Sequence, residues 1–113
     1  MSFSEDAKNT MLEALTDKIN YVTIYDEDGE EINTPEDEPQ RQKVEWKEPA
    51  EGKVYADNQP EFTVPEETTV ASVGYYDKQE NGKELVKDEN IEVEEYESQG
   101  IYRLTEIELE IEQ

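Results

Sequence analysis

The sequence contains no cysteine and no histidine among its 113 residues. Without cysteine the chain has no disulfide scaffold, no thiolate zinc site and no thiol nucleophile. Without histidine it lacks the usual general base at neutral pH and the commonest protein ligand of transition metals. Phosphate-cradling glycine loops and nucleophile elbows are missing as well. We therefore expect a protein that is not an enzyme.

Basic residues are also scarce, because 10 Lys and Arg stand against 32 Asp and Glu and leave a net charge of -22. Nucleic acids and anionic membrane surfaces are bound through clustered Lys and Arg, so we expect neither as a partner. No apolar run reaches the length of a membrane span, and no signal-peptide core follows Met1. The acidity itself favours solubility and salt tolerance, and it fits cation binding, a basic partner or mimicry of DNA.

One helix is predicted at about residues 4–15. Ser2 or Ser4 can cap it, and the acidic residues that follow suit the first turn of a helix. Apolar residues recur at helical spacing and form a single stripe. Such a stripe packs on the chain's own sheet or docks on a partner. The candidate partner-binding residues of this helix are Met11, Leu12 and Leu15.

The stretch from residue 59 to residue 77 carries the clearest strand pattern and little charge. Phe62 and Val64 alternate with polar residues before Pro65, which is typical of a strand with one face on the core. Residues 70–76 are apolar on both faces, which is typical of a central, fully covered strand. Residues 66–68 would connect the two strands.

Short alternating or β-branched stretches predict further strands at residues 21–25, 41–46, 54–56, 84–86, 91–96 and 101–111. Turn residues separate them, among them Asn81-Gly82, a hairpin signal. We expect one domain, residues 1–113, of mainly β class: an antiparallel β-sandwich or jelly-roll-like barrel of about seven to eight short strands with one N-terminal helix. The acidic stretch at 26–40 is predicted to be a long exposed loop.

The last strand changes its pattern part-way. Tyr102 and Leu104 share one face, whereas the apolar residues after Glu106 share the other, so a bulge or bend near Thr105 would place both sets in the core. The glutamates at positions 106, 108, 110 and 112 would then face water and discourage edge pairing. The candidate partner-binding residues of this strand are Ile107, Leu109 and Ile111.

A cation loop is suggested by the carboxylates of Asp26 and Asp28, which precede Gly29. The pattern lacks the third ligand before the glycine and the Glu six residues after it that an EF-hand loop has. An acidic hairpin turn explains the same residues. The candidate metal ligands are Asp26, Asp28 and Glu31, and we expect no cofactor, with a divalent cation as the alternative.

The order of segments resembles a family of small structural proteins of tailed bacteriophages, the tail-fibre, minor virion or capsid-decorating proteins. An Ala- and Leu-containing helix at residues 3–15 leads into a strand, then into Arg41-Gln42-Lys43-Val44-Glu45-Trp46, then into the stretch at 59–77, and finally into Gly100-Ile101-Tyr102-Arg103-Leu104-Thr105. The match covers most of the chain, from Phe3 to about Leu109. Family members are commonly rich in Gly, Ala, Ser and Thr, whereas this chain has Glu and Asp at many exposed places. The resemblance implies no catalytic residue.

This resemblance predicts a non-enzymatic virion protein that assembles in multiple copies on the capsid, the neck or the tail. Its partners would be other virion proteins and further copies of itself, and it would be assembled in the host cytoplasm. Two other functions fit the residues. One is an adhesion module that binds calcium or carbohydrate through a β-sandwich, and the other is an acidic DNA mimic that inhibits a nucleic-acid enzyme.

Overall fold

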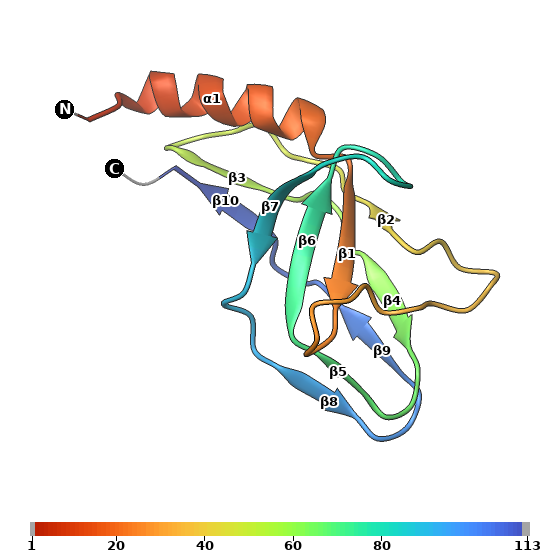
Figure 1. The fold of residues 1–113 in the computed structure, drawn as a ribbon. Coiled ribbons are helices and arrows are strands. Elements are labelled where there is room, and N and C mark those ends of the chain that lie inside the picture. The colour runs from red at the N-terminus through yellow and green to blue at the C-terminus, as the bar shows by residue number, and fades with distance from the viewer. Residues whose placement is uncertain (1, 112–113) are drawn as a thin grey trace.

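The computed structural model describes residues 2–111, which form one helix and ten strands (Figure 1). The elements are α1 (Glu5–Lys18), β1 (Tyr21–Tyr25), β2 (Gln42–Lys43), β3 (Lys53–Tyr55), β4 (Glu61–Val64), β5 (Thr68–Val70), β6 (Ser72–Tyr76), β7 (Glu84–Asp88), β8 (Glu94–Tyr96), β9 (Gly100–Arg103) and β10 (Glu108–Glu110). Every strand pair is antiparallel. The predicted class is confirmed, although the strands are shorter and more numerous than expected.

Helix α1 begins at the second of the two serines that could cap it. The side chain of Ser4 accepts a hydrogen bond from the backbone N–H of Ala7 at 3.1 Å. The helix continues to Lys18, three residues beyond the predicted end at Leu15, and the cation there suits the helix C-terminus. Asn9 holds the helix to the turn before β3 by accepting from the N–H of Gly52 at 2.9 Å.

Most of the chain after α1 and β1 is one long antiparallel ribbon, in which residues 53–76 pair with residues 84–110. Val64 pairs with Gly100 and Thr68 with Tyr96, so the same number of residues separates the two pairs on both strands. The ladders β4–β9 and β5–β8 are therefore in one register. The turn at 77–83 closes the ribbon, and Asn81 and Gly82 both have positive φ there.

The ribbon bends where its two strands differ in length. From Val70 to Val73 the first strand has three steps, whereas the second has six, from Asp88 to Glu94. A smaller mismatch lies between β3–β10 and β4–β9, where the first strand has six steps from Tyr55 to Glu61 and the second has five from Arg103 to Glu108; residues 104–107 lie outside both ladders. Extra residues on one strand bend a ladder and increase its twist. The predicted bend near Thr105 is confirmed.

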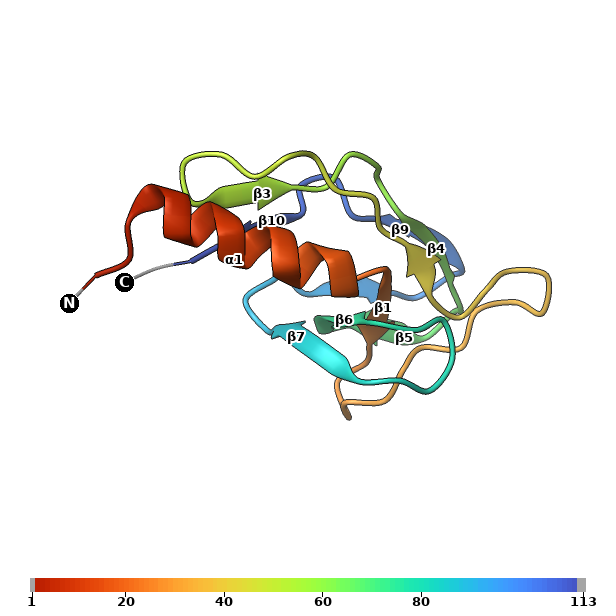
Figure 2. The ribbon, with the colours of Figure 1, turned by 90° about the horizontal axis from the view of Figure 1, so that it is seen from above.

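The bends fold the ribbon into two layers (Figure 2). One layer is the four-stranded sheet β2-β1-β6-β7, and β3, β10, β4 and β9 form the other. Helix α1 lies beside β3 at one end (Figure 1). Between the layers lies a continuous core whose fully buried members include Val22, Ile24, Phe62, Val64 and Val73. This arrangement is the sandwich that the strand patterns predict.

Two details differ from the sequence prediction. The covered strand predicted at 70–76 is split, because β5 pairs with β8, whereas β6 lies between β1 and β7. The stretch at 26–40 is not wholly exposed, since Ile32 lies in the core with 3% exposure. The carboxylate of Glu38 also accepts from the backbone N–H of Thr63 at 2.8 Å and from its hydroxyl at 2.6 Å. The loop thus covers the edge of β4.

Candidate functional site

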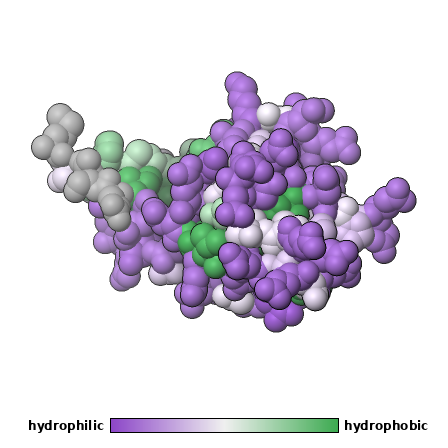
Figure 3. Space-filling model, turned by 60° about the horizontal axis from the view of Figure 1, so that its bottom comes forward, coloured by the Kyte–Doolittle hydropathy of each residue, from purple (hydrophilic) through white to green (hydrophobic). Residues whose placement is uncertain are grey.

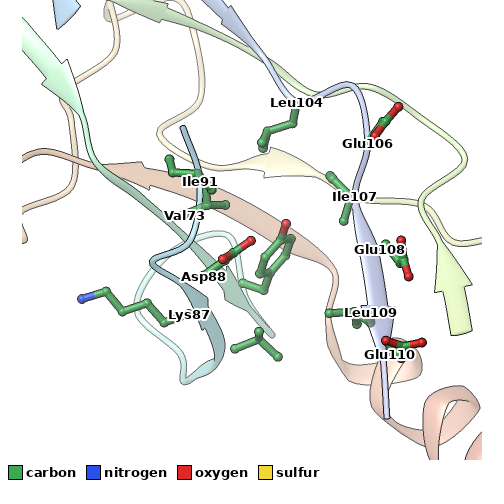
Figure 4. A pocket seen from close by; sticks show the side chains of 12 residues that line it. Val73, Lys87, Asp88, Ile91, Leu104, Glu106, Ile107, Glu108, Leu109 and Glu110 are labelled. Atoms are coloured by element: carbon green, nitrogen blue, oxygen red, sulfur yellow. The ribbon is translucent and has the colours of Figure 1, made fainter. Parts of the chain in front are cut away.

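The sandwich is open on one side, where the edge strands β7 and β10 face each other across a groove of about 510 Å³ (Figure 4). Strand β7 is the last strand of the four-stranded sheet, and β10 pairs on one side with β3. Apolar side chains from both layers line the groove: Val73, Val86, Ile91, Leu104, Ile107 and Leu109. The groove therefore offers apolar surface next to two strand edges.

Strand β10 presents two chemically different faces. Ile107 and Leu109 point toward β6 and β7, whereas Glu108 and Glu110 point to the other side (Figure 4). On that side Lys53 of β3 bridges the two glutamates, with Nζ–O distances of 3.8 Å and 3.5 Å. The coulombic attraction of Glu110 and Glu108 raises the pKa of Lys53. The alternation of apolar and acidic residues in β10 thus separates an apolar face from an acidic face.

Within residues 2–111, the backbone of β10 is bonded on one side only. Ala56 donates to the carbonyl of Ile107 at 3.0 Å, and the N–H of Ile111 donates to the carbonyl of Gly52 at 3.3 Å. Between these bonds Leu109 is paired with Val54. In an antiparallel ladder the residues that bond to one neighbour alternate with residues whose N–H and C=O point the other way. The backbone groups of Glu108 and Glu110 therefore point toward the free edge.

Polar and charged side chains line the groove as well, namely Tyr75, Lys87, Asp88, Glu106, Glu108 and Glu110. Asp88 lies opposite Val73 in the β6–β7 ladder and points into the groove (Figure 4). Burial and the nearby charge of Asp88 raise the pKa of Tyr75, and burial followed by the charges of Glu94 and Asp88 raises the pKa of Tyr102. Asp88 thus lies near two buried phenols whose pKa values are raised.

A second polar cluster lies on the opposite face of the four-stranded sheet, around Arg41. Arg41 is 7% exposed, and its guanidinium stacks on the ring of Tyr76 at 3.6 Å. It donates to the carboxylate of Glu31 at 2.8 Å and to the carbonyls of Lys78 and Asn81 at 3.0 Å and 2.6 Å. Burial alone would lower the pKa of Arg41, but Glu31 offsets this and the pKa is raised. Arg41 thus fastens the 77–83 turn to the sheet.

Tyrosine hydroxyls continue this cluster toward β7. The hydroxyls of Tyr25 and Tyr76 are hydrogen-bonded to each other, and Tyr25 donates to Glu84 at 2.9 Å. Burial and the hydrogen bonds to Tyr76 and Glu84 raise the pKa of Tyr25 far above its usual value. The cluster joins four segments of the chain. The sequence analysis did not predict this cluster. The only indication in the sequence was the presence of Arg41 in a chain with few basic residues.

Two of the three candidate metal ligands, Asp26 and Glu31, have carboxylates that are held in other interactions. One carboxylate oxygen of Asp26 accepts from the N–H groups of Asp28 and Glu30, at 2.9 Å and 3.0 Å. Glu31 accepts from Arg41 and, at 2.9 Å, from the hydroxyl of Thr23. Within residues 2–111 no group of three acidic side chains is placed to hold a metal ion. The acidic turn therefore explains Asp26 and Asp28, and Glu31 belongs to the Arg41 cluster.

The candidate partner-binding residues divide into buried and accessible ones. Leu12 is fully buried and Ile107 is 5% exposed in the core, so neither side chain is available to a partner as predicted. Leu15 and Leu109 pack against the core but are partly exposed. Met11 and Ile111 are half-buried. Of the two proposed contact elements, β10 is the one that combines accessible apolar surface with a free edge.

The rest of the visible surface is dominated by hydrophilic residues, with small separate hydrophobic patches (Figure 3). Large apolar side chains that are more than half exposed are Val93 and Ile101, each at 56%. Scattered apolar residues of this kind are normal on protein surfaces. None of the helices described between residues 2 and 111 is long and apolar enough to cross a membrane.

Comparisons of the chain with protein-family models, with curated proteins and with solved structures found no match. The resemblance to small phage structural proteins therefore stays a prediction based on the order of its segments.

Proposed function

We propose that this protein is a non-enzymatic structural component of a bacteriophage virion, held in several copies on the capsid, the neck or the tail. The observation that carries the proposal is the open side of the sandwich. There a free strand edge runs beside a groove lined by apolar and acidic side chains, and this combination is suited to contact with another polypeptide. The resemblance of the segment order to phage structural proteins suggests that this contact would be made in a phage particle.

Several features of the fold support a structural role. The long ribbon ties distant parts of the chain into one sandwich, and the Arg41 cluster fastens its terminal turn. The charged groups of the cluster are bonded to one another or to backbone carbonyls. Such groups stabilise a fixed shape, which is what a repeated building block of a particle needs. The acidic surface keeps copies apart in solution until a partner neutralises it.

The proposal is tested by removing the protein from the particle. We expect particles produced without the gene to lack a surface or neck feature in negative-stain images, and the feature should return when the gene is supplied in trans. A variant with Arg41→Met, expressed in trans, controls for dosage, because it reduces the amount of folded protein without altering β10. Fully infectious particles of unchanged appearance would count against a virion role.

A further inference from the structure

We propose that the free edge of β10 binds an extended segment of a partner protein in which basic and apolar residues alternate. The segment would pair with β10 in the antiparallel sense, as an additional strand. This inference rests on the proposed function, since it names the contact by which the protein would join its assembly. It concerns residues 107–111 of the chain and the groove beside them.

The backbone of β10 fixes which residues would form the hydrogen bonds. The N–H and C=O groups of Glu108 and Glu110 point away from β3, as the bonds of Ile107, Leu109 and Ile111 to the β3 side require. An added antiparallel strand would exchange bonds with these two residues. The partner residues opposite them would place their side chains on the same face as the two glutamates.

The charges on that face select a basic partner. In the chain itself Lys53 already lies across from Glu110 on β3 and bridges both glutamates. A Lys or Arg on an added strand would stand in the same relation to them from the free side. Glu106 is also exposed and extends the acidic face by one more position. Opposite charges on directly paired residues stabilise a sheet, and like charges destabilise it.

The other face of the added strand would meet the groove. Its side chains would lie next to Leu109 and across from Val86 and Ile91, which are all partly exposed. Apolar side chains at these places would remove groove surface from water, whereas charged ones would lose hydration without a partner. Asp88 is the exception, because it could accept from a single basic or hydroxyl side chain. The pattern of the partner is therefore basic outside and apolar inside.

A second copy of this chain does not fit the edge. Pairing of two β10 strands would place glutamates opposite glutamates, between molecules that each carry a net charge of -22. Acidic side chains on an edge strand are a known protection against such self-pairing. The same side chains leave the edge open to a basic strand.

The test uses the purified protein and a short synthetic peptide of alternating lysine and valine. Binding is measured by calorimetry and by amide shifts in NMR spectra. Two matched peptides are methylated on backbone amide nitrogens. One carries the methyl groups on the amides of its lysines, and the other carries them on the amides of its valines. The backbone N–H groups of the lysines would donate to carbonyls of β10. The peptide methylated at its lysine amides should therefore bind about tenfold more weakly or worse, since about two hydrogen bonds are lost. The valine-methylated peptide should bind like the parent.

Equal affinity of the two methylated peptides would overturn the proposal, as would equal binding by a peptide of alternating glutamate and valine. Shifts that spare residues 107–111 would also overturn it. The variant E108Q/E110Q should bind the parent peptide more weakly and with less dependence on salt. A dimer of the free protein that Glu108→Pro disrupts would show that a second copy occupies the edge, against the proposal.

The outcome is separable from that of the virion experiment. Failure of the peptides with the protein present in particles would remove the β10 contact and leave the virion role. Specific peptide binding by a protein that is absent from particles would leave the β10 contact and remove the virion role.

Discussion

Replacement of Arg41 by methionine should destabilise the protein strongly, whereas the same replacement of Arg103 should not. The two arginines are matched, because each donates to one glutamate, at 2.8 Å in the Arg41–Glu31 pair and at 2.6 Å in the Arg103–Glu61 pair. They differ in burial. The side chain of Arg41 is 8% exposed and that of Glu31 26%, whereas those of Arg103 and Glu61 are 52% and 47% exposed. Arg41 also donates to two backbone carbonyls of the 77–83 turn.

The size of the effect follows from what the methionine leaves behind. Two carbonyls lose a charged donor and Glu31 loses its counter-ion, and the removal of one partner from a buried pair costs about 3–5 kcal/mol. Because Glu31 retains some contact with water, we expect a loss of about 3 kcal/mol in the free energy of unfolding for Arg41→Met. An exposed pair contributes about 0–1 kcal/mol, so Arg103→Met should fall within that range.

The assay is urea unfolding followed by circular dichroism, with hydrogen exchange as a local readout. At about 4 °C per kcal/mol for a chain of this size, Arg41→Met should also lower the melting temperature by about 12 °C. The increase in exchange rate caused by Arg41→Met should be larger for amides of the 77–83 turn than for amides of β4 and β9. If the two methionine variants were equally stable within 0.5 kcal/mol (about the error of the comparison), the role assigned to Arg41 would be wrong.

Gly74→Ala should cost about 1–3 kcal/mol, because the added Cβ would lie 2.5 Å from the ring of Tyr25, and Gly29→Ala, which meets no atom within 4 Å but has a φ of +80°, should cost about 1 kcal/mol in the same thermal melts. Stability should fall above about pH 10, since tyrosines whose pKa is raised in the folded state contribute stability below their unfolded pKa near 10 and lose it as the pH rises toward the folded value. The pKa of Tyr96 is raised to about 12 by burial and by its hydrogen bond to Glu94, so in absorbance titrations at 295 nm this residue should ionise only above about pH 10. Ionisation of all seven tyrosines near pH 10 in the folded protein would contradict the burial described. The melting temperature should rise with sodium chloride, because screening reduces the repulsion within a chain of net charge -22, and a fall would contradict this.

Local patterns predicted the elements better than their pairing. The β-branched run at 21–25, the alternation around Phe62 and the parity change near Thr105 each report which side of a strand is covered, and each corresponds to a feature of the fold. The register of the ribbon depends instead on how many residues each strand spends in a bend. The extra residues at 89–93 look like ordinary strand in sequence, since Ile91 and Val93 alternate with acids, yet they leave the ladder there.

The candidate site was likewise predicted only in part, because local patterns give the faces of a strand but not its neighbours. Alternation in the last strand is visible in sequence, and it correctly places Leu109 and Glu108 on opposite faces. Whether that strand has a free edge depends on β7, which lies far away in the chain and faces it across the groove. The Arg41 cluster needed the positions of four segments at once. No spacing rule relates Arg41 to Glu31 and to the carbonyls of a distant turn.

The most direct test of the virion role is quantitative mass spectrometry of gradient-purified particles. We expect peptides of this protein in the particle fraction, at several copies per particle when normalised to the major capsid protein, and we expect them to remain after a wash at high salt that removes loosely adsorbed proteins. Recovery of the protein only in the soluble fraction of the lysate, with none in washed particles, would contradict the proposal.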